Sequence, residues 1–377
     1  MVDAQHAKTT AGQFAADNIE PFAAEWERSR RFPREAVGAA ARVGLLGLLV
    51  PRRLGGLGLG VGDMAEVMRL LAAADMGLAF SLVCHNNLAG AIAARGGPYH
   101  HHEHLPGLLD GSTLGGFLLT EPTVGSDATA IRTRAERTAD GWVINGDKAW
   151  ATNGTDAGLV NVYVQTEPGR GARGIAAFLV DTSTPGVERG PAYEMLAAHS
   201  TGTASFRFND VVVGEAQLFI QPGEAFAAAM EAIDIARLMV SQMCIGMLDR
   251  ALTMAVAYLS ERHAFGKPLA EQQGLQWMLA DVATDLEAAR GLAARAASAI
   301  EGGERDRAVY AAHAKKFATR VAMAGLSQCM QALGANGFRH DRPLARHLAS
   351  AKMAQYLDGT TEVQNIVISR ALFGVRD

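Results

Sequence analysis

The period of the hydrophobic pattern changes twice along the chain, and this restricts the fold more than any other feature. Over residues 218–377, apolar side chains recur with helical spacing in long stretches that contain few glycines or prolines. Four long helices are expected there, over residues 225–262, 271–300, 306–333 and 343–372. Long amphipathic helices with short connections predict an antiparallel four-helix bundle as the C-terminal domain.

Residues 1–112 also have helical spacing, but in shorter pieces. The segment is rich in alanine, which favours helix because it loses no side-chain entropy. Pro21, Pro33, Pro51 and a glycine cluster at residues 55–62 interrupt the pattern. We therefore expect an N-terminal domain of short helices.

Between the helical zones, residues 113–217 contain short β-branched and aromatic runs that alternate with polar residues. Asn145-Gly146 separates two such runs and predicts a hairpin turn, because both residues tolerate positive φ. Frequent turns and short strands predict a central antiparallel β domain, built as a sandwich or barrel. The fold class is therefore α+β with three domains.

The composition excludes several functions. With 35 Lys and Arg against 39 Asp and Glu, the net charge is −4, and no nucleic-acid partner is expected. The three cysteines are far apart, which is typical of a reducing compartment. No long uncharged apolar run and no signal peptide are recognisable, so we expect a cytoplasmic protein without a membrane partner.

Three patterns suggest chemistry but have simpler interpretations. The glycine cluster lacks the G-x-G-x-x-G register of dinucleotide sites and predicts a structural loop. Four histidines within residues 100–104 cannot all bind one ion, so a solvated loop and no metal site are expected. No G-x-S-x-G motif supports a hydrolase.

Two segments carry stronger signals. Residues 119–127 combine a glycine with small hydroxyl donors, among them Thr120 and Ser126, which suits binding of a planar polar ring or a carbonyl. Residues 144–154 include Trp150 and Thr152 on alternate positions. The tryptophan is either a core residue or an indole that stacks on a flavin.

At these segments the chain resembles the acyl-CoA dehydrogenase family of flavoproteins. Five motifs follow the family's order, at residues 119–127, 144–154, 261–268, 331–338 and 358–364. The resemblance implies a helical N-terminal domain, a central β domain and a C-terminal four-helix bundle. It also implies non-covalently bound FAD and oxidation of an acyl thioester to its α,β-enoyl form.

The resemblance assigns roles to individual residues. Thr120 and Thr152 would bond the flavin ring, and Trp150 would cover one of its faces. Thr360 and Glu362 would lie near the FAD, where Thr361 and Gln364 form a capping box. A further group would reach the FAD of a neighbouring subunit, which implies a homotetramer or at least a dimer: Arg262, Phe265, Gln273, Gln331 and Ala335.

The thioester side is assigned in the same way. Ser126 would lie along the pantetheine channel, with Asp234 and Arg237 near the acyl thioester. The carboxylate base would be Asp358, because the alternative position that some relatives use holds Ala236. The family's usual base is glutamate, and the shorter side chain withdraws the carboxylate by about 1.5 Å.

This shortening leaves three activities open. The chain is a dehydrogenase with a shifted backbone, a flavin oxidase or monooxygenase such as the nitroalkane-oxidising relatives, or a weakly active thioester-binding flavoprotein. A dehydrogenase of this family would pass electrons to an electron-transferring flavoprotein. His199-Ser200-Thr201 replaces the family's arginine-x-serine, so the thioester carrier is either CoA or an acyl carrier protein.

Overall fold

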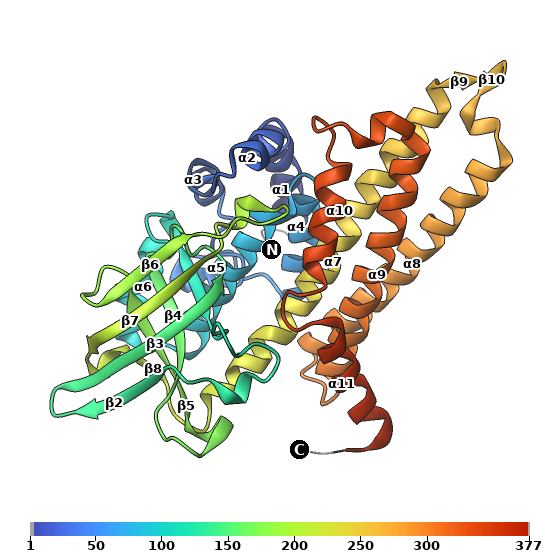
Figure 1. The fold of residues 1–377 in the computed structure, drawn as a ribbon. Coiled ribbons are helices and arrows are strands. Elements are labelled where there is room, and N and C mark those ends of the chain that lie inside the picture. Colours follow the sequence, from blue (N-terminus) through green and yellow to red (C-terminus); the bar gives the residue numbers. More distant parts are fainter. Residues whose placement is uncertain (1–3, 376–377) are drawn as a thin grey trace.

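The computed structural model describes residues 4–375. A β-sheet and a long helical bundle lie on opposite sides of the molecule, with the N-terminal helices packed between them (Figure 1). Three apolar cores hold this arrangement together. One joins the N-terminal helices to the bundle, one lies between helices and sheet, and one lies among the strands.

The N-terminal domain is helical, as predicted. Its helices are α1 (Ala4–Asn18), α2 (Ala23–Ser29), α3 (Arg34–Arg42), α4 (Val61–Ala72), α5 (Met76–Arg95) and α6 (Pro98–Asp110). Asp75 caps α5 by accepting a hydrogen bond of 2.8 Å from the amide of Leu78. The expected histidine loop is wrong: His100 to His104 lie within α6, where His100 and His101 contact main-chain oxygens. Within residues 4–375 no group of three metal-ligating side chains occurs.

The central sheet contains β1 (Gly115–Leu118), β2 (Arg134–Thr138), β3 (Gly141–Ala151), β4 (Leu159–Gln165), β5 (Ile175–Asp181), β6 (Val187–Ala192), β7 (Ala204–Val213) and β8 (Leu218–Ile220). The strand order is β6-β7-β3-β2-β4-β5-β8, and β1 pairs with β4. The pairs are antiparallel except at β4, which runs parallel to β1 and β2.

The predicted hairpin turn at Asn145-Gly146 is wrong. Both residues lie inside β3, where the register with β7 shifts between Ile144 and Gly146. Gly146 has φ +142°, and a Cβ there would lie 2.6 Å from the Cα of Thr133. The Asn-Gly pair therefore serves a β-bulge rather than a turn, and both devices need the same conformational freedom.

The C-terminal domain consists of α7 (Ala225–Glu261), α8 (Gln273–Glu301), α9 (Arg307–Leu333), α10 (Leu344–Ala354) and α11 (Thr361–Phe373). A short hairpin, β9 (His263–Ala264) with β10 (Lys267–Pro268), joins α7 to α8. The predicted fourth helix is in fact two helices. Asp358 and Gly359 have φ of +50° and +91°, which ends helical geometry before α11 begins.

By length and composition alone, α5 and α7 are apolar enough to cross a membrane, contrary to the sequence expectation. In the fold, 78% of the most apolar window of α5 is buried, and α5 contacts both the sheet and α7. Burial inside the protein accounts for the apolar composition of this helix.

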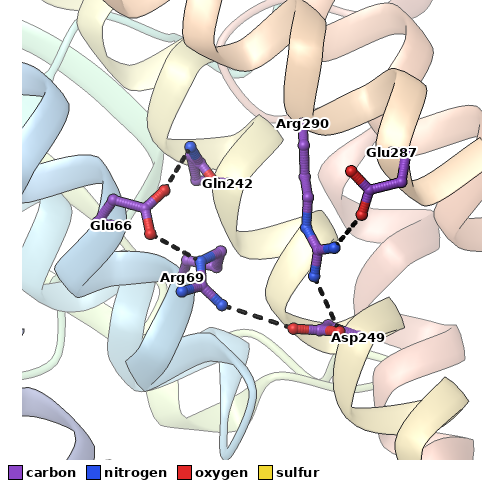
Figure 2. Close-up of polar contacts among 6 residues, drawn as sticks. All are labelled: Glu66, Arg69, Gln242, Asp249, Glu287 and Arg290. Carbon is purple, nitrogen blue, oxygen red and sulfur yellow. Dashed lines mark hydrogen bonds and ion pairs between the residues drawn. The ribbon is translucent and has the colours of Figure 1, made fainter.

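A polar network fastens α4 to α7 and α8 (Figure 2). Arg69 on α4 contacts Glu66 at 3.0 Å and Asp249 of α7 at 3.6 Å. Asp249 also pairs with Arg290 of α8 at 2.9 Å. One carboxylate thus joins two arginines from different domains.

Candidate active site

Asp358 occupies the turn between α10 and α11. Its Oδ2 atom is buried and has no hydrogen-bond partner in residues 4–375. Burial raises the pKa of this carboxyl from its ordinary value of 3.8 to about 6, although the charges of Lys315 and Arg237 oppose the rise. A carboxylate with a free oxygen and a pKa near neutrality is suited to accept a proton.

Side chains from three helices hold the main chain at this turn. Arg237 of α7 donates from Nε to the oxygen of Asp358 at 3.1 Å. Lys315 of α9 donates to the oxygen of Gly359 at 2.6 Å, and Gln364 of α11 donates to the same oxygen at 2.9 Å. These bonds stabilise the positive φ of Asp358, which costs free energy in a residue other than glycine.

Asp234 and Arg237 form a buried ion pair of 3.0 Å on α7. Burial raises the pKa of Asp234, although the Arg237 charge opposes the rise. The structure therefore brings both predicted thioester residues to the neighbourhood of Asp358, but it joins them first to each other.

Thr152 approaches the site from the sheet. It follows β3, is only 8% exposed, and acts to lower the pKa of the Cys84 thiol of α5, against the larger effect of burial. Cys84 in turn lies close enough to Asp358 for the carboxylate to raise its pKa further, beyond the rise due to burial. Cys84 thus connects the predicted flavin residue Thr152 to the predicted base.

Thr120 lies in the segment after β1, which a buried ion pair holds in place. Lys148 donates to Glu121 at 2.9 Å and to the oxygen of Leu119 at 3.0 Å. Burial lowers the pKa of Lys148 to about 8, against the opposing effect of Glu121. Ser126, farther along the loop, is exposed.

Glu121 completes this anchor. Burial raises its pKa, but the Lys148 charge and the amides of Arg132 and Thr133 outweigh that effect and lower it overall. The two amides donate to its carboxylate at 2.7 and 2.8 Å. This buried, hydrogen-bonded ion pair fixes the loop that presents Thr120.

Trp150 has an unusual conformation. Its φ is +58°, its side chain is 60% exposed, and its ring stacks on Tyr193 with centroids 4.4 Å apart. Of the two sequence interpretations, the buried core residue is therefore wrong. A bulky residue at positive φ is strained and points to a functional role.

The residues expected to reach a neighbouring subunit do not lie beside Asp358. Phe265 is 93% exposed at the tip of the β9–β10 hairpin, at the opposite end of the bundle from α11 (Figure 1). Arg262 and Gln273 flank this hairpin and are also exposed. The exposed Gln331 and Ala335 lie where α9 ends.

Thr360 is the N-cap of α11 and accepts a hydrogen bond from the amide of Val363 at 3.4 Å. The predicted capping box of Thr361 and Gln364 is wrong, because the cap lies one residue earlier and Gln364 donates to carbonyls instead. Glu362 is exposed in the first turn of α11.

The sequence reasoning missed two residues of the site. Lys315 is 1% exposed and lies on the same buried face of α9 as Ala311, Ala314 and Ala318. A lysine among the apolar positions of a helix is the sequence feature that could have identified it. Cys84 carries no comparable signal, since its position on α5 only becomes meaningful once the turn at Asp358 is folded against it.

The segment that departs from the family pattern packs against N-terminal helices. His199 approaches Glu27 of α2 at 3.1 Å, and Ser200 donates to Asp75 at the start of α5. These contacts give His199-Ser200-Thr201 a role in joining the sheet to the N-terminal domain.

Comparison with protein families gives a match over nearly the whole chain. The N-terminal, middle and C-terminal domain models of acyl-CoA dehydrogenase match residues 3–112, 116–211 and 223–373. The chain belongs to the acyl-CoA dehydrogenase family. The predicted resemblance and fold class are thereby confirmed.

Individual relatives agree. Acryloyl-CoA reductase (NADH) of Anaerotignum propionicum is 35% identical over 96% of this chain and 92% of its own. The structure of butyryl-CoA dehydrogenase from Megasphaera elsdenii has a TM-score of 0.94 and 32% identity, covering 99% of each chain. A chain solved in work on the electron transferring flavoprotein of Acidaminococcus fermentans has a TM-score of 0.95 and 34% identity, covering 100% of this chain and 99% of its own.

The protein is therefore an oxidoreductase that acts on CH–CH groups of acyl-CoA compounds, with FAD as its cofactor. The residues present fit that cofactor. Thr120 and Thr152 offer hydroxyls from two neighbouring segments, and the amide of Ala149 bonds the oxygen of Thr120 at 2.9 Å, which ties these segments together. The exposed indole of Trp150 adds an aromatic surface of the kind that packs on a planar ring.

Proposed function

We propose that this enzyme oxidises an acyl thioester to the α,β-enoyl thioester, with Asp358 as the base that removes the α-proton. The observation that carries the proposal is the free, buried Oδ2 of Asp358, on a carboxyl whose pKa is raised to about 6. Both properties are required of a base that must be ionised near neutral pH and still accept a proton.

The surrounding residues would hold the turn and bind the flavin ring. Arg237, Lys315 and Gln364 bind main-chain oxygens of the turn and so leave the carboxylate itself unoccupied. Thr120, Thr152 and Trp150 would hold the flavin ring opposite the base. Bound FAD supplies the acceptor for the β-hydride.

The Asp234–Arg237 pair would shape the thioester end of the pocket, and Ser126 would lie along the pantetheine channel. Both assignments follow from the resemblance to the family, and the burial of the ion pair supports the first. Thr360, the N-cap of α11, would lie near the FAD diphosphate, and Glu362 in the first turn would lie near the FAD. Amides at a helix N-terminus favour a negatively charged group.

We further propose a homotetramer in which one subunit contributes to the FAD site of another. The exposure of Arg262, Phe265, Gln273, Gln331 and Ala335 at one end of the bundle supports this assembly. An electron-transferring flavoprotein is the proposed electron acceptor, consistent with the similarity to the Acidaminococcus chain. A cytoplasmic location is proposed because all three cysteines are free.

The test is anaerobic mixing of the FAD-loaded enzyme with a panel of thioesters: short, branched and hydroxylated acyl-CoAs, and the same acyl groups on a carrier protein. Bleaching of the visible flavin band by one acyl-CoA, with appearance of the enoyl product, would support the proposal and identify the acyl class. Rapid hydrogen peroxide formation when air is admitted would favour the oxidase alternative. Bleaching by nitroalkanes alone, or by no compound, would contradict the proposal.

A further inference from the structure

Lys315 is a buried ammonium group directly beneath the turn that carries Asp358. It lies on α9, 1% exposed, and its Nζ donates to the oxygen of Gly359 at 2.6 Å and to that of Gln355 at 3.4 Å. The two oxygens belong to the residues on either side of the Tyr356–Asp358 segment. The lysine therefore ties both ends of the turn to α9.

The ammonium group serves the main chain and not the carboxylate. Asp358 Oδ2 has no hydrogen-bond partner within the described residues, although the Lys315 charge is near enough to oppose the rise of its pKa. This arrangement separates two effects of one side chain. Its hydrogen bonds place the turn, while its charge favours the ionised carboxyl.

The other charged and titratable groups around this pair come from the three helices α5, α7 and α11. Asp358 interacts electrostatically with Lys315, with Arg237 of α7 and with Cys84 of α5. Lys315 interacts with Asp358, Arg237, Cys244 of α7 and Glu362 of α11. Arg237 is the other cation near the carboxyl, and it is already paired with Asp234.

We propose that Lys315 is a positioning residue for the base, acting both by anchoring the 355–359 turn and by stabilising the carboxylate of Asp358. The proposal rests on the proposed role of Asp358 as base. A base one methylene shorter than the family's glutamate depends more strongly on backbone placement, because a misplacement of about 1 Å can cost on the order of a hundredfold in rate.

Burying a lysine is costly, and burial lowers the pKa of Lys315 to about 8 against the effect of nearby anions. A methionine of similar length would fill the same space without that cost. The retained charge therefore indicates a function in the site and not only packing between α9 and the turn.

Two variants separate the two effects. Lys315→Met removes both the donor and the charge, whereas Lys315→Gln keeps an amide donor and removes the charge. We expect the Met variant to lower the rate of α-deuterium exchange into an acyl-CoA by roughly ten- to a hundredfold. The Gln variant is expected to lose less. In both variants the pH midpoint of exchange should rise, since a positive charge beside the carboxyl is gone.

Cys244→Ala is the matched control. It creates a small cavity beside Lys315 without changing any charge, because burial raises the pKa of this thiol to about 12. The control should lower thermal stability and leave the midpoint of exchange in place. FAD content and KM for the acyl-CoA should stay within a few-fold in all variants.

The proposal would be overturned if the pH midpoint of exchange is unchanged in both lysine variants and their exchange rates fall only in proportion to the loss of thermal stability, as in Cys244→Ala. If the Met variant does not fold, the midpoint of the Gln variant decides alone. Asp358→Asn is measured in parallel. Exchange that persists in Asp358→Asn would refute the role of Asp358 as the base. Loss of exchange in Asp358→Asn, together with an unshifted pH midpoint in both lysine variants, would refute only the role of Lys315.

Discussion

Arg237 donates a hydrogen bond from Nε to the main-chain oxygen of Asp358 at 3.1 Å, although the two residues are 121 positions apart in the sequence. The contact holds the turn by its backbone and leaves the carboxylate free. Since the same guanidinium pairs with Asp234 at 3.0 Å, its position is fixed independently of the base. The geometry thus combines a firmly held backbone with an unoccupied carboxyl oxygen.

The base should cost the protein stability. The pKa of Asp358 is about 6 in the folded state against an ordinary value of 3.8, so the folded state resists ionisation above pH 4. At pH 7 this corresponds to as much as about 3 kcal/mol of lost folding free energy. We expect Asp358→Asn to be more stable than the native protein at pH 7 in denaturant unfolding.

The sign of this effect can be checked by lowering the pH. Below about pH 4 the carboxyl is protonated in both the folded and the unfolded state, so the advantage of Asp358→Asn should disappear there. An advantage that persists unchanged at low pH, or that is missing at pH 7, would show that the burial of Asp358 carries no electrostatic cost.

The pH dependence of the reaction follows from the same group. The base must be ionised, so kcat/KM should rise through about pH 6 and reach a plateau near neutral pH. Steady-state rates at thioester concentrations well below KM, with a constant electron acceptor, measure this profile. A rise centred near the ordinary value of 3.8 would mean that the pocket does not perturb the base.

The exposed end of the bundle should be an assembly surface. Phe265→Asp places a charge on a side chain that is 93% exposed in one subunit, so folding of the subunit should be unaffected. If Phe265 reaches a neighbouring subunit, the variant should dissociate and lose FAD. Light scattering and the flavin-to-protein absorbance ratio measure both.

Val212→Asp is the control for this surface, because Val212 is 60% exposed on β7, away from the bundle. This variant should keep the native assembly and its FAD. If Phe265→Asp and Val212→Asp have the same assembly and the same FAD content, the exposure of Phe265 no longer supports a shared FAD site.

The network of Figure 2 should stabilise the contact between α4 and the bundle. Asp249→Asn leaves Arg69 and Arg290 without their shared carboxylate, and we expect a loss of about 1 kcal/mol in the free energy of unfolding. The exposed pair of Arg170 and Glu167 offers the control: Glu167→Gln should change stability by less than about 0.5 kcal/mol. A similar effect of both substitutions would mean that the network adds nothing.

Much of the architecture could be predicted because hydrophobic period reports local geometry. The long helices α7, α8 and α9 follow directly from their apolar spacing. The apolar pattern did not show that the predicted fourth helix breaks before Asp358, since Leu357 and Thr361 continue a helical spacing. Contacts with Arg237 and Lys315, which are distant in sequence, stabilise the turn together with Gln364.

The predicted hairpin turn depended on an equally ambiguous sequence pattern. Asn145-Gly146 signals a conformation that glycine permits, but whether the chain uses it for a hairpin or a bulge depends on the pairing of β3 with β7. The motifs predicted Thr152 and Asp358 as residues of one site, and in the structure each influences the pKa of Cys84. The position of Cys84 near Thr152 and Asp358 could not be predicted from the sequence, because α5 lies beside them only in the folded protein.

The central claim is that Asp358 removes the α-proton, and single-turnover reduction of the bound flavin tests it most directly. Native enzyme and Asp358→Asn, both loaded with FAD, are mixed anaerobically with the best acyl-CoA and followed by the visible flavin absorbance. We predict that flavin reduction in the variant slows by roughly 10²- to 10⁴-fold while the thioester still binds. Reduction at the native rate in Asp358→Asn would contradict the account and assign the proton to another group.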